Sequence, residues 1–278
     1  MNHHQHHDTS TPMFSFFELW RPDLLVLLIL VGILYLLLIG PWRKFFADSE
    51  RVPGKQVFYF FTSLGIIYLA KGTPINIYGH HIMFSAHMTQ MALLYLVLPP
   101  IMIVGLPVWF YKSLLKPSFV KKTLHFLTLP LVSILLFNTL FSLYHFPFVF
   151  DNVMNSGWAH VIYHTALLIS AFIMWIPVCS PLPEYETLTD LKKIVYIFAG
   201  GFLLTPVCAL IIFARMPMYE TYMGAPQIFH LLPSLDDQQL GGVIMKVIQE
   251  LSYITAIAVI FFSWARKERR KDTEGVME

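Results

Sequence analysis

Charge and cysteine are both scarce in this sequence. Only 13% of its 278 residues are Asp, Glu, Lys or Arg, against about a quarter in soluble domains, and 56% are hydrophobic. The mean hydropathy is +0.61. This balance excludes an ordinary soluble domain. It predicts an all-α integral membrane protein, because a backbone in lipid must satisfy its own hydrogen bonds and a helix does so within one segment.

Only two cysteines are present, Cys179 and Cys208. They fall at different depths of two predicted spans, so we expect no disulfide between them. The sequence has no CxxC motif, which excludes the usual thiol-pair metal site. No basic region precedes the first apolar segment and a basic loop follows it directly. We therefore expect this segment to be a retained span and not a cleaved signal.

Long apolar runs, by contrast, recur along the whole chain. A helix needs about 20 residues to cross the hydrocarbon core of a membrane. Seven runs reach or approach this length, at residues 24–42, 56–71, 82–106, 124–144, 158–178, 192–215 and 241–264. The second run is the shortest and weakest. The third contains Pro99 and Pro100, which predict a kink or break in its later half.

The basic residues lie mainly on one side of these spans. Fifteen of the 19 Lys and Arg residues follow the first, third, fifth and seventh spans. Because cytoplasmic loops carry an excess of basic residues, the N-terminus is predicted outside and the C-terminus in the cytoplasm. The expected organisation is an extracytoplasmic arm at 1–23, a transmembrane domain of seven helices at 24–265 and a basic cytoplasmic tail at 266–278.

Histidine is concentrated on the predicted outer side, where eleven of the 12 lie; only His125 is cytoplasmic. Four of them converge from three spans: His87, His145, His160 and His164. His160 and His164 are four residues apart and share one helix face, a spacing that suits a shared metal ion. The competing interpretation is a hydrogen-bonded network that packs the bundle interior. The remaining outer histidines are His3, His4, His6 and His7 in the N-terminal arm, His80 and His81 at the edge of the third span, and His230 in the last outer loop.

Methionine supplies a second group of candidate ligands. Met83 and Met91 lie four residues on either side of His87, so the three side chains are predicted on one helix face. Thioethers are soft ligands that select Cu(I), and imidazole also binds copper. Apolar packing is the alternative role for a row of methionines.

Three polar residues are candidates for hydrogen bonds that orient these ligands: Gln90, Asp151 and Asp237. Capping a turn is the alternative for Asp151. Asp237 is also a candidate helix cap or a partner for Lys246, which lies inside the seventh span. Glu250 follows Lys246 by one helical turn, so an ion pair between them is the simplest interpretation of that residue.

Three separated motifs resemble one protein family. The segments SAHMTQMALLYLVLPPIMIVGLP (85–107), YHFPFVFDNVMNSGWAHVIYHTALLISAFIMWIPV (144–178) and LDDQQLGGVIMK (235–246) are similar to the CtaG family of caa3-type cytochrome c oxidase assembly factors, especially its Bacillus members. His87, Met88 and Gln90 match the family pattern His-Met-x-Gln-His. Met91 stands where many members have histidine, and Lys246 stands where the family tends to have an aromatic residue.

The resemblance implies a multi-pass protein of the bacterial plasma membrane that a haem–copper oxidase needs to become active, and not an enzyme. Together with the ligand inventory, it leads us to expect Cu(I) bound near the outer face by His87, His145, His160 and His164, with Met83 and Met91, and delivered to the oxidase. Expected partners are caa3-type oxidase subunits, extracytoplasmic copper chaperones and membrane lipid, with no nucleic acid.

Three other functions compete with this expectation. The first is a scaffold for oxidase assembly that binds no metal and uses its histidines in a hydrogen-bonded network. The second is a zinc-dependent intramembrane hydrolase, for which no clear general base stands beside the histidines. The third is a haem protein with histidines of two helices as axial ligands.

Overall fold

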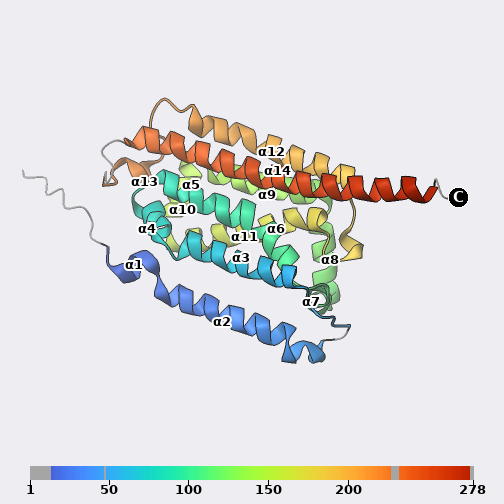
Figure 1. Cartoon of the computed structure of the whole chain (residues 1–278). Helices are drawn as coiled ribbons and strands as arrows, with labels where there is room; N and C mark the ends of the chain where they lie inside the picture. Colours follow the sequence, from blue (N-terminus) through green and yellow to red (C-terminus); the bar gives the residue numbers. More distant parts are fainter. Residues whose placement is uncertain (1–13, 47, 227–231, 276–278) are drawn as a thin grey trace, which may run out of the picture.

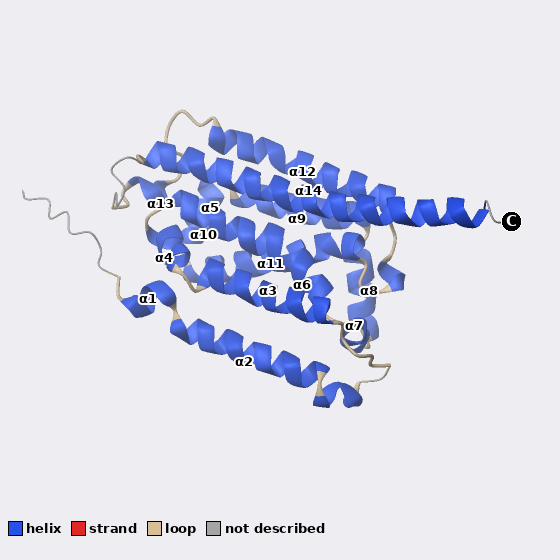
Figure 2. Cartoon of the chain, viewed as in Figure 1, coloured by secondary structure: helices blue, strands red, loops and turns tan. Residues whose placement is uncertain are grey.

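The computed structural model describes residues 14–46, 48–226 and 232–275, and every regular element in these ranges is helical (Figure 2). The predicted all-α class is confirmed. The histidines of the N-terminal arm and His230 lie outside the described residues. The helices are α1 (Phe16–Trp20), α2 (Pro22–Ile39), α3 (Gly54–Lys71), α4 (Pro74–His81), α5 (Phe84–Ala92), α6 (Leu98–Gly105), α7 (Val108–Leu114), α8 (Ser118–Leu127), α9 (Pro130–Tyr144), α10 (Pro147–Met154), α11 (Gly157–Cys179), α12 (Asp190–Ile212), α13 (Glu220–Met223) and α14 (Ser234–Gly275), with a π-helical segment at Leu93–Val97 and 3-10 turns at Pro41–Phe45 and Pro183–Tyr185.

Among the described residues, five segments are long and apolar enough to cross a membrane: Phe16–Ile39, Phe84–Gly105, Gly157–Cys179, Asp190–Ile212 and Ser234–Lys271. Helices α8 and α9 meet at an angle of 76° and make a sixth candidate if together they form one span. Helix α3 lies at the position of the second predicted span but is not among these candidates. Helices therefore lie at all seven predicted positions, and the number of crossings and the orientation of the termini stay predictions.

The long helices run side by side, and α1 and the C-terminal end of α14 lie at opposite ends of the bundle (Figure 1). The short helices α4, α10 and α13 gather at the α1 end, while α7 and α8 lie at the other end. Helix α14 packs mainly on α12 and α5, and α11 packs on α9 and α6. Helix α2 packs on α3 in a separate small cluster around Tyr35 and Phe60, whose rings stack with their centroids 3.7 Å apart.

The third predicted span runs as one helical segment from Phe84 to Gly105, with a π-helical turn ahead of Pro99 and Pro100. Pro100 has no N–H to offer the carbonyl oxygen of Leu96 one turn earlier. The Ser252 hydroxyl of α14 donates to that oxygen instead, at 2.9 Å. The two prolines are thus accommodated by a wider turn and by a neighbouring helix, as membrane helices allow.

The start of α14 packs closely against its neighbours because two glycines lie there. A Cβ on Gly241 would lie 2.6 Å from the ring of Phe84, and one on Gly242 would lie 2.9 Å from Ile211. Further along α14, Lys246 and Glu250 form the predicted ion pair, with Nζ and Oε1 2.6 Å apart.

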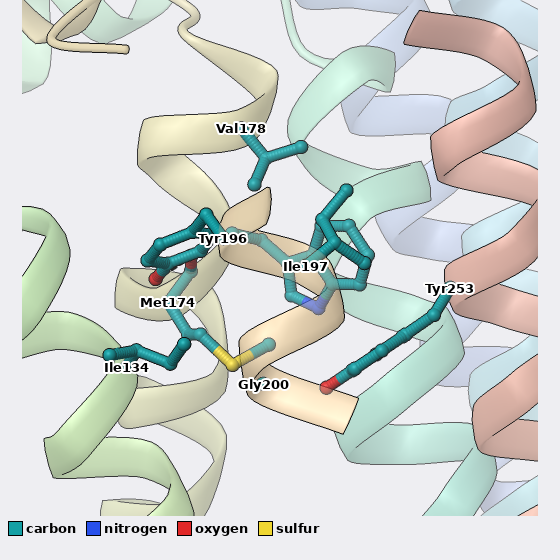
Figure 3. A pocket seen from close by; sticks show the side chains of 8 residues that line it. Ile134, Met174, Val178, Tyr196, Ile197, Gly200 and Tyr253 are labelled. Atoms are coloured by element: carbon teal, nitrogen blue, oxygen red, sulfur yellow. Dashed lines mark hydrogen bonds between the residues drawn. The ribbon is translucent and has the colours of Figure 1, made fainter. Parts of the chain in front are cut away.

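Two cavities of the described chain are lined without histidine. The smaller, of about 10 Å³, is lined by Met174, Tyr196 and Tyr253 among others, and the Tyr196 hydroxyl donates to the Met174 carbonyl oxygen at 2.9 Å (Figure 3). The larger, of about 650 Å³, has a mainly apolar lining from α3, α6, α11 and α14. The described histidines therefore lie apart from both cavities.

Candidate functional site

The buried end of the histidine region begins at His87, which α5 carries into the core with no exposed surface. Helix α5 begins at Phe84 because the Asp237 carboxylate of α14 caps it. This carboxylate accepts the backbone N–H of Phe84 at 2.6 Å and also bonds the Ser85 hydroxyl. The hydrogen bonds of Asp237 go to Phe84 and Ser85, not to Lys246 or a histidine. Asp237 therefore affects the site only by fixing the position of α5.

Close packing of α4 against α5 holds the backbone of His87. A Cβ on Gly79 would lie 2.8 Å from the backbone nitrogen of His87 and 2.9 Å from its Cα, so only glycine fits this position without a shift. The Tyr222 hydroxyl donates to the Gly79 carbonyl oxygen at 2.5 Å and ties α13 to the same contact.

The hydroxyl of Tyr144, at the end of α9, lies between two of the predicted histidine ligands. Its oxygen is 2.9 Å from Nε2 of His87 and 3.1 Å from Nε2 of His164. It is also 3.6 Å from the sulfur of Met154 on α10. Nδ1 of His164 in turn lies 2.6 Å from the Tyr95 hydroxyl. Two tyrosines therefore hold His87 and His164 in one buried network.

A row of imidazoles connects this network with the surface. The ring centroids of His164 and His160 are 4.1 Å apart, those of His160 and His80 are 5.0 Å apart, and those of His80 and His81 are 4.9 Å apart. His164 is buried, His160 and His80 are half-buried and His81 is exposed. The shared face of His160 and His164, predicted from their spacing, is confirmed.

The electrostatics of this row favour neutral imidazole at its middle. Burial lowers the pKa of His80 below its usual 6.5, and the neighbouring His81 and Lys71 lower it further. A neutral imidazole keeps a nitrogen lone pair, which is the form that binds a metal ion.

His145 has separate hydrogen bonds. Its Nδ1–H donates to the Phe141 carbonyl oxygen at 2.7 Å, and its Nε2 has no hydrogen-bond partner although the residue is fully buried. The Tyr219 hydroxyl donates to the carbonyl oxygen of His145 at 2.9 Å. In the part of the chain that the structure describes, no three His, Cys, Asp or Glu side chains are placed to hold one metal ion. The expected four-histidine cluster is therefore not assembled in this conformation, because His164 is held by tyrosines and His145 by its own helix.

The predicted helix face of Met83, His87 and Met91 is corrected by the structure. Met83 precedes α5 and has extended backbone, with φ −127° and ψ 121°, so it does not continue the helix face of His87. The reason is that α5 begins only at Phe84, where Asp237 caps it. Met91 is 1% exposed and belongs to the hydrophobic core.

The two other polar candidates, Gln90 and Asp151, form hydrogen bonds with residues other than the histidines. The Gln90 amide donates to the Ala70 carbonyl oxygen at 2.7 Å and to Asn76 Oδ1 at 2.9 Å. The Asp151 carboxylate accepts the N–H and hydroxyl of Thr221 at 3.0 and 2.7 Å, so it takes the capping role that was its alternative. Both residues fix the short helices around the site.

Sequence reasoning did not select Tyr95, Tyr144, Met154 or His80 as parts of this site. One signal for Tyr95 was present, because it follows His87 by eight residues and such residues share a helix face. Tyr144 directly precedes His145 in the second motif. Nothing local indicated that Met154 of α10 would reach Tyr144, since that contact depends on how α9 and α10 fold back on each other.

The model of one family, described as cytochrome c oxidase caa3 assembly factor (Caa3_CtaG), matches residues 33–267. The chain belongs to this family. The match includes every residue of the histidine row and of the tyrosine network, so the site lies within the family's shared region.

Curated relatives occur in mycobacteria. Uncharacterized proteins of Mycobacterium bovis and Mycobacterium tuberculosis are each 24% identical over 78% of this chain, and one of Mycobacterium leprae is 25% identical over 92%. The chain spans only 35% to 41% of the length of these relatives. No solved structure matches the chain.

Proposed function

We propose that this protein is a multi-pass plasma-membrane assembly factor for caa3-type cytochrome c oxidase that accepts Cu(I) at its histidine-rich end and passes it to an oxidase subunit. The family match supports the role in assembly. The observation that carries the copper role is the row of imidazoles from exposed His81 to buried His164, with successive ring centroids 4.1 to 5.0 Å apart.

Such a row can move a soft cation by ligand exchange. Each imidazole lies within ring contact of the next, so an ion can bind the following nitrogen before it leaves the previous one. No hydrogen bond engages the ring nitrogens of His80 or His160 within the described residues, and their lone pairs are free to bind. Cu(I) fits this path better than harder ions because it accepts imidazole and thioether ligands.

Within the described chain, no three His, Cys, Asp or Glu side chains are placed around one point, which suits a carrier better than a storage protein. A closed site with four ligands holds its metal tightly, whereas an incomplete site exchanges it. Extracytoplasmic copper chaperones are the proposed donors at His81, and oxidase subunits the proposed acceptors. Exposed apolar side chains on α2, α12 and α14 provide the surface for lipid.

The experiment replaces His80 and His160 by alanine, singly and together, in cells that depend on the caa3 oxidase. His125→Ala is the matched control because His125 is on α8 at the opposite end of the bundle. We expect the His80 and His160 variants to reach the membrane at normal levels while oxidase activity and the copper content of the purified oxidase fall. Normal copper in the oxidase of the double variant would refute the copper role.

A metal-free scaffold for oxidase assembly is the second candidate. The observation that favours it is the tyrosine network, which satisfies His87 and His164 by hydrogen bonds without any ion. This candidate predicts that purified protein retains no Cu(I) and that oxidase assembly survives the loss of His80 and His160.

The zinc hydrolase is not favoured by the site. Within the described chain, Asp151 caps α13, Asp237 caps α5 and Glu250 pairs with Lys246. None of these three carboxylates hydrogen-bonds a histidine, so none is placed as a general base for a water molecule at the imidazoles.

A further inference from the structure

The Tyr144 hydroxyl is the meeting point of three potential metal ligands from three helices. These are Nε2 of His87 on α5 at 2.9 Å, Nε2 of His164 on α11 at 3.1 Å and the sulfur of Met154 on α10 at 3.6 Å. All three side chains therefore direct a lone-pair atom toward the same buried point.

The hydroxyl has a single hydrogen, which it can donate to only one of the two nitrogens or to the sulfur. If Nε2 of His87 carries a hydrogen and donates it to Tyr144, the buried Nδ1 of His87 is left as an unpaired acceptor. If Nδ1 carries the hydrogen instead, that N–H has no acceptor, since Nδ1 has no partner in the structure. Nδ1 of His87 therefore stays without a partner in either tautomer, and the hydrogen bond to Tyr144 does not select one tautomer of this ring.

A cation at this point would engage all three donor atoms at once. Two imidazole nitrogens and a thioether sulfur form a set that favours Cu(I) over Zn²⁺ or Mg²⁺, because the thioether is soft and uncharged. Metal–nitrogen bonds are about 2.0–2.1 Å long, as zinc sites show, so each imidazole must approach the ion by roughly 1 Å from its present distance to the hydroxyl oxygen. The long, unbranched methionine side chain adapts readily to such a shift.

Tyr95 already prepares His164 for this role. A neutral His164 that binds through Nε2 must carry its hydrogen on Nδ1, and the Tyr95 oxygen lies 2.6 Å from Nδ1 as the acceptor. Metal-binding histidines usually donate their other N–H in this way, which fixes the tautomer and the ring orientation.

We propose that Met154, with His87 and His164, forms the terminal Cu(I) site of the imidazole row, and that the Tyr144 hydroxyl holds the place of the ion in the metal-free state. This inference rests on the proposed function, because it identifies the site at which the transported Cu(I) ion binds last. When Cu(I) arrives from His160, the Tyr144 phenol rotates away from the site. When the ion is released, the phenol rotates back. No electron is transferred and no covalent bond within the protein changes.

The test measures Cu(I) binding by purified, detergent-solubilised protein against a chromogenic Cu(I) chelator under anaerobic, reducing conditions. Met154→Leu removes the sulfur at nearly constant volume. Met174→Leu is the matched control, since Met174 is a buried methionine of α11 that lines the small cavity of Figure 3. Tyr144→Phe removes the hydroxyl while keeping the ring. Copper K-edge X-ray absorption of the loaded proteins then reports whether sulfur is bound to copper.

We expect Met154→Leu to lose the sulfur signal and at least about tenfold in Cu(I) affinity, and Met174→Leu to match the wild type; a tenfold change corresponds to ~1.4 kcal/mol. Tyr144→Phe should bind Cu(I) at least as tightly as the wild type, because the hydroxyl competes with the ion and is not its ligand. Weaker binding in Tyr144→Phe, or copper with only nitrogen neighbours in the wild type, would overturn this inference and leave the copper role standing. Wild-type protein that binds no Cu(I) would overturn both.

Discussion

Replacing Gly79 by alanine tests whether the close contact of α4 and α5 positions the site. The added Cβ would lie 2.8 Å from the nitrogen and 2.9 Å from the Cα of His87, and 3.1 Å from the carbonyl carbon of Ala86. These are backbone atoms and cannot turn aside as a side chain can. An ordinary contact distance therefore requires the two helices to separate by about 0.5–1 Å, and overpacking of this kind costs typically 1–3 kcal/mol.

The same displacement moves the imidazole of His87 relative to Tyr144. The hydrogen bond between them is 2.9 Å long, so a shift of this size distorts it. Binding sites generally tolerate only about 0.5 Å of misplacement. We therefore expect Gly79→Ala to reduce Cu(I) affinity as well as stability, although residue 79 supplies no ligand atom.

The measurement is the thermal unfolding midpoint of the purified protein in detergent, followed by Cu(I) titration. Gly65→Ala is the control, because nothing lies within 4 Å of a Cβ at Gly65 on α3 and alanine favours helix by up to about 1 kcal/mol. We expect a lower midpoint for Gly79→Ala, and an unchanged or higher one for Gly65→Ala. Equal midpoints and equal Cu(I) affinities for Gly79→Ala and the wild type would refute this reasoning.

Two further predictions concern the π-helical turn in the third span and the imidazole row. Ser252→Ala removes the donor to the Leu96 carbonyl oxygen and should cost about 0.6–1.7 kcal/mol, seen as a lower unfolding midpoint than in Thr255→Ala, whose hydroxyl bonds only its own helix. Because burial and neighbouring groups lower the pKa of His80 below 6.5, and because protonation removes its lone pair, Cu(I) uptake that depends on His80 should persist at pH 6.5 and fall only at more acidic pH. If Cu(I) uptake by the wild type declined around a pH of 6.5 or higher, and the His80→Ala variant showed no such decline, the pH argument would be contradicted.

Local patterns in the sequence anticipated the features that depend on neighbours along one helix. The pairing of His160 with His164 and of Lys246 with Glu250 follows from four-residue spacing, and both are present. The same spacing argument wrongly placed Met83 on the helix face of His87, because the start of α5 is set by the Asp237 carboxylate from a distant helix. A spacing rule holds only inside a helix, and the sequence places helix ends less accurately than helix interiors.

By itself, the sequence determined that this chain is helical and that several of its helices are apolar enough to span a membrane, since hydropathy acts along the chain. The tertiary structure decided which of the histidines meet. His164 reaches Tyr95, Tyr144 and His160, whereas the imidazole of His145 hydrogen-bonds only within its own helix. The physical reason is that contacts between helices depend on the depth and rotation of each one, which are set by close packing at points such as Gly79 and Gly241.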